Sequence, residues 1–343
     1  MKKFDFVVGN PPFDEETENN TRKKPLYHYF LDASNKISRK SILIHPARFL
    51  FNAGQTPKDW NKKILNDKHF NILKYESDGS KYFEGKQIKG GIAISYRDED
   101  KIIGPIKIFT NYAELTHIVK KIDSVNDNYL NNLVSPRGNY RFTNDFFRKY
   151  PYAKEKFGKG TSNMIVSNVM DKIPEVFNHE NELEDNLEYV KILGRENNKR
   201  KYMYLKREFV IDNPYIDTFN VTLPESNGSG KFGEKLSTPL VSKPSFGSTD
   251  TFINIGNFET LYEAESCLKY IKTKFTRALL GVKKVTQHNP SKVWKYVPLQ
   301  DFTENSDIDW SKSIPEIDQQ LYKKYGLSPE EIEFIEEKVQ EME

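Results

Sequence analysis

The sequence has little cysteine, no long apolar run and almost no net charge. Its single cysteine, Cys267, excludes an intrachain disulfide and a zinc site made of several cysteines. Rare cysteine indicates a reducing compartment, and without a membrane-length apolar run or a signal peptide we expect a cytoplasmic protein. The formal net charge of +3 does not decide for or against a nucleic-acid partner, since a local basic face matters more than the total.

What is present indicates a globular α/β protein. Charged residues make up 29% and hydrophobic residues 37% of 343 residues, a length that favours two domains. Apolar patterns alternate between strand and helix spacing in the first third of the chain, which predicts a mixed sheet. The first strand is nearly all apolar, as expected of a strand buried on both faces. The expected strands are 4–9, 41–46, 70–76 and 90–97, and the expected helices are 25–37 and 57–66.

The composition changes after about residue 123, so we predict domains at 1–122 and 123–343. The second part contains a stretch rich in basic residues and tyrosine at 191–207, and one amphipathic helix is expected at 261–280. Two helices are expected to close the chain, at 314–325 and from Ser328 onward, where a cap, a proline and acidic residues mark a helix start. With seven glutamates and one lysine, the last helix is expected to face away from any DNA.

The first strand leads directly into Asn10-Pro11-Pro12-Phe13. The amino group of adenine or cytosine is a poor nucleophile, and two acceptors aimed at its N–H bonds would activate it. The Asn10 side-chain oxygen and the Pro11 carbonyl can accept these bonds, the two prolines keep the turn rigid, and Phe13 offers a flat face to a flipped base. Such a site works by positioning and electrostatics. The alternative is a plain turn after a strand.

The segment from Asp5 to Phe13 resembles motif IV of the DNA amino-methyltransferases. Residues 41–50, a strand stopping at Pro46, resemble their motif VI, and residues 81–94 resemble motif VIII, in which an aromatic residue packs against the flipped base. The resemblance implies that Phe83 is a second aromatic wall beside Phe13. Residues 294–302, 309–310 and 317–322 resemble the end of type II restriction-modification adenine methylases. A core phenylalanine is the alternative for Phe83.

The motif order resembles the gamma class, in which a donor-binding half precedes the catalytic half and a C-terminal target-recognition domain. The resemblance implies site-specific adenine-N6 methylation of double-stranded DNA in a bacterial restriction-modification system. The fold it implies is the C-terminal half of a Rossmann-like methyltransferase sheet followed by a mixed α/β recognition domain.

The S-adenosylmethionine pocket of this family lies before motif IV, but only nine residues precede Asn10. We therefore expect a separate N-terminal methyltransferase half to hold this cofactor and to cover the otherwise bare, apolar edge of the first strand. The alternative is a non-catalytic DNA-specificity module or an inactive truncated methylase.

Two segments of the second part are candidates for DNA contact. Basic, hydroxyl and amide side chains suit phosphates and base edges, and Gln287 can read adenine bidentately. In the basic stretch 199–207, Lys199, Arg200, Lys201, Lys206 and Arg207 could also meet phosphates, with a solvated charged face as the alternative. The candidate DNA-binding residues are Lys243, Ser245, Ser248, Thr249, Lys283, Lys284, Thr286 and Gln287.

We expect no metal site. The six histidines have no metal-ligand spacing on a helix. Glu84-Gly85-Lys86 has the Glu-x-Lys form of a nuclease, but Asp78 lies too close before it for the usual arrangement.

Overall fold

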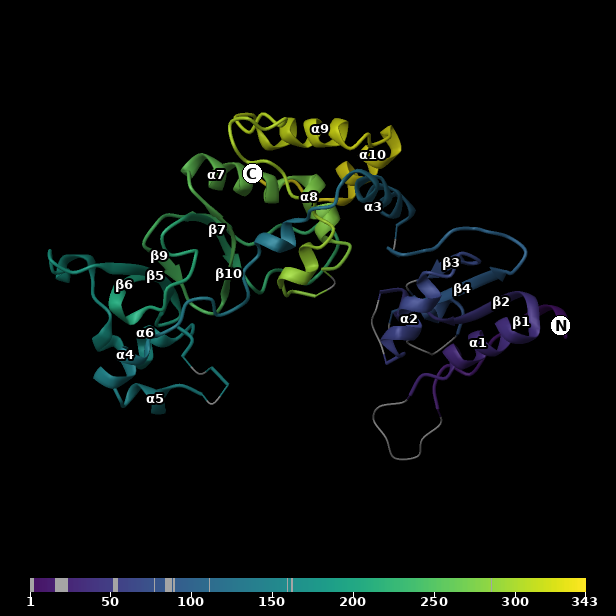
Figure 1. Ribbon diagram of the computed structural model, residues 1–343, viewed down its shortest axis with the longest axis horizontal. Helices are drawn as coiled ribbons and strands as arrows, with labels where there is room; N and C mark the ends of the chain where they lie inside the picture. The colour runs from purple at the N-terminus through teal and green to yellow at the C-terminus, as the bar shows by residue number, and fades with distance from the viewer. Residues whose placement is uncertain are drawn as a thin grey trace. The chain divides into compact units, whose positions relative to one another are not determined.

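The computed structural model describes residues 3–15, 24–51, 55–76, 78–83, 88, 90–110, 112–158, 160–161, 163–284 and 286–343 (Figure 1). The chain divides into two compact units, Met1–Thr116 and His117–Glu343. The division falls inside helix α3 (Ala113–Val125), which also contains the boundary expected at residue 122. None of the helices in these described ranges is long and apolar enough to cross a membrane.

The first unit contains a four-stranded mixed sheet in the order β1-β2-β4-β3. β1 and β2 pair in parallel through the crossover helix α1, and β4 lies antiparallel between β2 and β3. The predicted α/β alternation is therefore confirmed. The elements are β1 (Phe4–Gly9), α1 (Tyr27–Ile37), β2 (Ser38–Pro46), a 3-10 turn (Arg48–Phe51), α2 (Lys58–Leu65), β3 (Phe70–Glu76), a 3-10 turn (Gly79–Lys81) and β4 (Ile92–Asp98).

The expected burial of the first strand on both faces is wrong. Phe4, Phe6 and Val8 are 55%, 60% and 74% exposed, whereas Val7 packs against the core of this unit. β1 pairs with β2 alone among the described strands, so one edge of β1 is open. An open apolar edge is an arrangement that proteins usually avoid or cover.

The second unit contains two three-stranded sheets, in the orders β10-β7-β8 and β6-β5-β9. The pairs are antiparallel except for β5 with β9, which is parallel. The strands are β5 (Tyr189–Glu196), β6 (Lys199–Lys206), β7 (Phe219–Pro224), β8 (Leu240–Ser242), β9 (Phe246–Ser248) and β10 (Phe252–Phe258). Short helices precede the sheets: α4 (Asn144–Lys149), α5 (Ala153–Lys156) and α6 (Val169–Lys172).

The expected helix at 261–280 is broken in two. α7 (Leu261–Lys272) ends before Thr273, whose ψ of 151° is not helical, and the Thr273 hydroxyl accepts the Thr276 N–H at 3.1 Å to begin α8 (Lys274–Leu280). A side-chain cap thus interrupts one apolar stripe, which periodicity alone does not show. The two closing helices are confirmed as α9 (Ile314–Lys324) and α10 (Pro329–Lys338), with Ser328 as the N-cap.

Candidate functional site

The Asn-Pro-Pro-Phe segment forms the turn that leaves the carboxyl end of β1. Asn10 and Pro12 are exposed, Pro11 is buried and Phe13 is half-buried. The Phe13 carbonyl accepts the Leu26 N–H at 2.9 Å, which ties the turn to the segment entering α1. The structure therefore presents the Asn10 side chain at a strand end while the backbone beside it is fixed.

Phe83, far from Phe13 in the sequence, lies against it in the structure. The ring centroids are 5.3 Å apart and the ring planes make an angle of 83°. A 3-10 turn places Phe83: Asp78 accepts the Ser80 N–H at 3.0 Å, and the Phe83 N–H donates to the Gly79 carbonyl at 3.0 Å. The two aromatic residues named from the sequence are thus brought together, edge to face and not as parallel walls.

A buried histidine, His45, lies on β2, and no pattern in the sequence pointed to a role for it. β1 ends opposite Leu43, and His45 follows two residues later with no exposed surface. Its Nε2 is 2.8 Å from the Ser95 hydroxyl, its Nδ1 is 3.1 Å from the Pro46 carbonyl, and its ring stacks on Tyr27 at 5.7 Å. Burial lowers the pKa of His45 to about 4, so the imidazole is neutral near pH 7.

Acid should destabilise the first unit through His45. The folded-state pKa of about 4 lies below the ordinary 6.5, so the unfolded chain binds the proton more readily and stability falls as pH drops from 6.5 toward 4. We expect a loss of about 2 kcal/mol between pH 7 and pH 5 from this group. Urea unfolding of wild type and of His45→Gln at pH 7 and pH 5 isolates the contribution of His45, because the contributions of the other titrating groups are the same in both proteins and cancel in the difference. An equal pH dependence in both proteins would contradict the assignment.

The first predicted DNA segment is only partly on the surface. Lys243 and Ser245 are exposed on the turn between β8 and β9, and Ser245 holds a φ of 66° while its carbonyl accepts the Lys191 N–H at 2.8 Å. Ser248 and Thr249 are only 3% and 2% exposed. Direct contact of Ser248 or Thr249 with DNA does not fit this burial.

The second predicted segment also separates into two groups. Thr286 and Gln287 are exposed, and Lys283 is half-buried with its ammonium 5.6 Å from the centre of the Tyr296 ring. Burial lowers the pKa of Lys283, and the charges of Lys295 and Lys292 lower it further.

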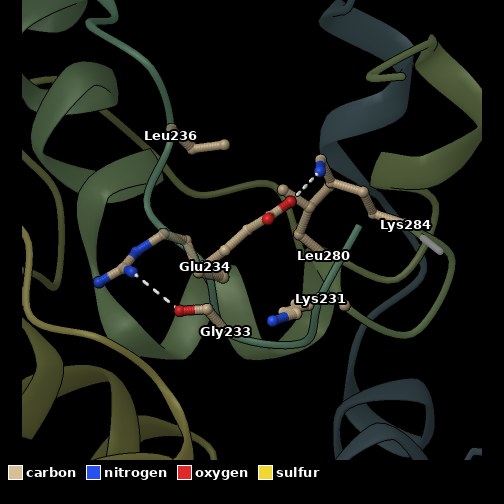
Figure 2. A pocket seen from close by; sticks show the side chains of 8 residues that line it. Lys231, Gly233, Glu234, Leu236, Leu280 and Lys284 are labelled. Carbon is tan, nitrogen blue, oxygen red and sulfur yellow. Dashed lines mark hydrogen bonds and ion pairs between the residues drawn. The ribbon is translucent and has the colours of Figure 1, made fainter. Parts of the chain in front are cut away.

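Lys284 points into the fold and is 5% exposed. It lines a pocket with Glu234, Leu280 and Arg277 (Figure 2). Its ammonium donates to the Glu234 carboxylate at 2.6 Å and to the carbonyls of Asn227 and Thr286 at 3.0 and 3.2 Å. A lysine has three N–H donors, so no donor remains for a phosphate, and contact of Lys284 with DNA does not fit this placement.

The part of the chain that the structure describes contains no candidate metal site. No three histidine, cysteine or acidic side chains converge there. Asp78, one of the carboxylates considered for a nuclease, is the cap of the turn before Phe83. The others, Glu84 and Lys86, lie outside the described residues.

Comparisons with known proteins address the first unit most directly. Among curated proteins there is no match. Among solved structures, the type IIG restriction endonuclease BpuSI is similar at a TM-score of 0.33 and 8% identity, over 89% of this chain and 41% of BpuSI. A TM-score of this size does not establish a shared fold. Residues 1–83 match the Eco57I restriction-modification methylase family, and this segment of the chain contains both Asn10-Pro11-Pro12-Phe13 and Phe83.

Proposed function

We propose that this chain carries the base-binding and DNA-recognition parts of a site-specific DNA adenine-N6 methyltransferase of a restriction-modification system. The observation that carries the proposal is the Asn10-to-Phe13 turn at the carboxyl end of β1, with Phe83 in contact with Phe13. The match of residues 1–83 to restriction-modification methylases supports it independently of this geometry.

The chemistry rests on two acceptors beside an aromatic surface. The side-chain oxygen of Asn10 and the carbonyl oxygen of Pro11 accept hydrogen bonds from the two N–H groups of the target amino group. The nitrogen is then drawn toward tetrahedral geometry, and its lone pair is no longer delocalised into the ring. The rings of Phe13 and Phe83 already touch, so a flipped base stacks on one exposed ring face or separates them on entry. Adenine is preferred over cytosine because the tetrapeptide begins with Asn, as in the resembling adenine enzymes.

S-adenosylmethionine would supply the methyl group. In the described part of residues 1–116, no glycine-rich turn follows the carboxyl end of a strand, so these residues do not by themselves fit the donor. The open edge of β1 and the exposed Phe4, Phe6 and Val8 support a donor-binding segment that pairs with β1 and covers these side chains.

The second unit is proposed to recognise the target sequence in double-stranded DNA. Lys243, Ser245, Lys283, Thr286 and Gln287 remain candidates for contact because they are exposed or half-buried. A DNA-specificity module without turnover is the second candidate function, which holds if no donor-binding segment pairs with the open edge of β1.

A methyl-transfer assay tests the proposal. The chain is combined with a donor-binding methyltransferase half and tritiated S-adenosylmethionine, and incorporation into double-stranded DNA is followed by nucleoside analysis for N6-methyladenine. Sequence-dependent incorporation supports the proposal. DNA binding without any methyl transfer would favour the specificity module.

The donor should not bind usefully to this chain alone. We expect no measurable heat of S-adenosylmethionine binding in calorimetry of the isolated chain, and binding after the donor-binding half is added, because the described part of residues 1–116 lacks a glycine-rich turn after a strand. Micromolar binding by this chain alone would contradict the division of the site between two segments.

A further inference from the structure

The β6-β5-β9 sheet has one face on a core, and its opposite face is exposed in part. Val190, Ile192, Met203 and Leu205 belong to the buried core of this region. Side chains alternate along a strand, so their neighbours lie on the opposite face. We call this opposite face the basic-aromatic face. Its exposed and half-buried members include Lys191, Arg195, Arg200, Tyr202, Tyr204 and Phe246, and between them Leu193 and Ser248 are buried.

One end of the basic-aromatic face is a fixed cluster of a cation and rings. The Lys191 ammonium lies 5.6 Å from the centre of the Tyr202 ring, 5.1 Å from that of Tyr204 and 5.5 Å from that of Phe246. Tyr202 and Phe246 also pack together, with centroids 5.9 Å apart, and Tyr202 remains 37% exposed. The cluster holds a positive charge and an exposed phenol ring in a set geometry.

The other end places two arginines opposite each other. Arg195 pairs with Arg200 across the antiparallel strands, next to the hairpin turn at Asn197 and Asn198, whose φ angles are 51° and 60°. Both arginines are exposed, and neither has an acidic ion-pair partner among the described residues. Like charges directly opposite destabilise a sheet. Arg200 is held by the Phe252 ring at 5.5 Å and by the Thr238 hydroxyl, which accepts its N–H at 2.8 Å, whereas Arg195 has no such contact among the described residues.

Little acidic charge offsets this face in the described part of the chain. Lys206, at the cluster end, pairs with Glu184 at 3.1 Å, and Glu180 lies near enough to Lys191 to act on its charge. Lys243, exposed on the adjoining turn before Phe246, adds a further cation. The net character is basic with aromatic residues between the charges, which complements a polyanion that also has sugar and base surfaces.

We propose that the basic-aromatic face binds the sugar-phosphate backbone of double-stranded DNA. Arg195 and Arg200 contact phosphates through their planar, multidentate guanidinium groups, and Tyr202 donates a hydroxyl hydrogen bond to the backbone. The assignment deepens the proposed function, on which it rests for the identity of the polyanion. It adds surface that the loops at Lys243 and Lys283 alone do not provide.

Salt-dependent DNA binding tests this face. Arg195→Gln/Arg200→Gln removes two cations, so the slope of log affinity against log salt concentration should fall by about 2 and affinity near 0.1 M salt should weaken at least about tenfold. Fluorescence anisotropy with a labelled duplex measures both without any methyl donor. An affinity and slope equal to wild type overturn the proposal.

The matched control is Lys323→Gln/Lys338→Gln, which removes two exposed cations from α9 and α10. Equal weakening in the control and test variants would show a general charge effect and overturn the proposal. Binding of poly-glutamate as tight as that of the duplex would overturn it as well. The single variant Arg195→Gln leaves the contacts of Arg200 with Phe252 and Thr238 intact and should lower the slope by about 1, which guards against misfolding. Failure of methyl transfer would leave this binding result unaffected, so the two proposals fail separately.

Discussion

Replacing Asn10 by alanine is expected to reduce methyl transfer by at least about a hundredfold, the scale of removing one preorganised hydrogen-bonding group from a reacting centre. Asn10 is exposed at the end of β1, and its side-chain oxygen is proposed to accept a hydrogen bond from the target amino group. Alanine leaves the Pro11 carbonyl as the remaining acceptor. Transfer of tritiated methyl groups to DNA, with the donor-binding half present, measures the effect.

DNA affinity provides the control for this variant. In our proposal Asn10 contacts only the flipped base and no other part of the DNA. The Asn10→Ala variant should therefore bind a duplex with an affinity within about twofold of wild type, while methyl transfer is lost. Asn10→Asp keeps an oxygen acceptor and should retain more activity than alanine. Full activity of Asn10→Ala would remove the turn from the catalytic site and leave the plain-turn interpretation.

Local signals in the sequence predicted most of the first unit. An apolar run that stops at Asn10 and a strand that stops at Pro46 are local features, and the structure contains both strands. The exposure of Phe4, Phe6 and Val8 could not be read from composition, because an apolar strand looks the same whether or not a neighbouring strand covers it.

The contact between Phe13 and Phe83 shows a different limit. The resemblance named both residues, but their edge-to-face geometry depends on a turn capped by Asp78 and on the pairing of β4 with β3. Long-range geometry of this kind is set by the packing of distant segments. The same holds for His45, whose neutral state follows from complete burial beside Tyr27 and Ser95.

Lys284 shows why charge patterns overestimate binding surfaces. Lys283 and Lys284 are adjacent and chemically identical, so sequence alone assigns both to DNA. In the structure, Lys283 is half-buried beside Tyr296, whereas Lys284 is enclosed with Glu234 (Figure 2). Burial by itself would raise the pKa of Glu234, but the Lys284 ammonium and the N–H groups of Ser229 and Gly230 lower it to about 2.

Lys284→Met is therefore expected to lower the free energy of unfolding of the second unit by about 3–5 kcal/mol, since it leaves a largely buried carboxylate without its cation. Urea unfolding in a Trp60→Phe background measures it, because the fluorescence then comes from Trp294 and Trp310 in this unit. Lys283→Met is the matched control. It removes a lysine that Lys292 and Lys295 repel, so it should leave stability nearly unchanged and weaken DNA binding in a salt-dependent way.

The double variant Lys284→Met/Glu234→Gln separates the charge from the packing. The two oxygens of the Glu234 carboxylate accept the N–H groups of Ser229 and Gly230 at 2.8 and 2.9 Å. The single amide oxygen of the glutamine introduced there can keep one of these two hydrogen bonds, and the side chain carries no charge that needs a partner. If the lost stability comes from an unpaired carboxylate, the double variant should regain about half of it. If Lys284 instead serves DNA, Lys284→Met would keep its stability and lose affinity as Lys283→Met does. The adjacent pair thus lets one experiment distinguish a lysine that supports the fold from one that is available to DNA.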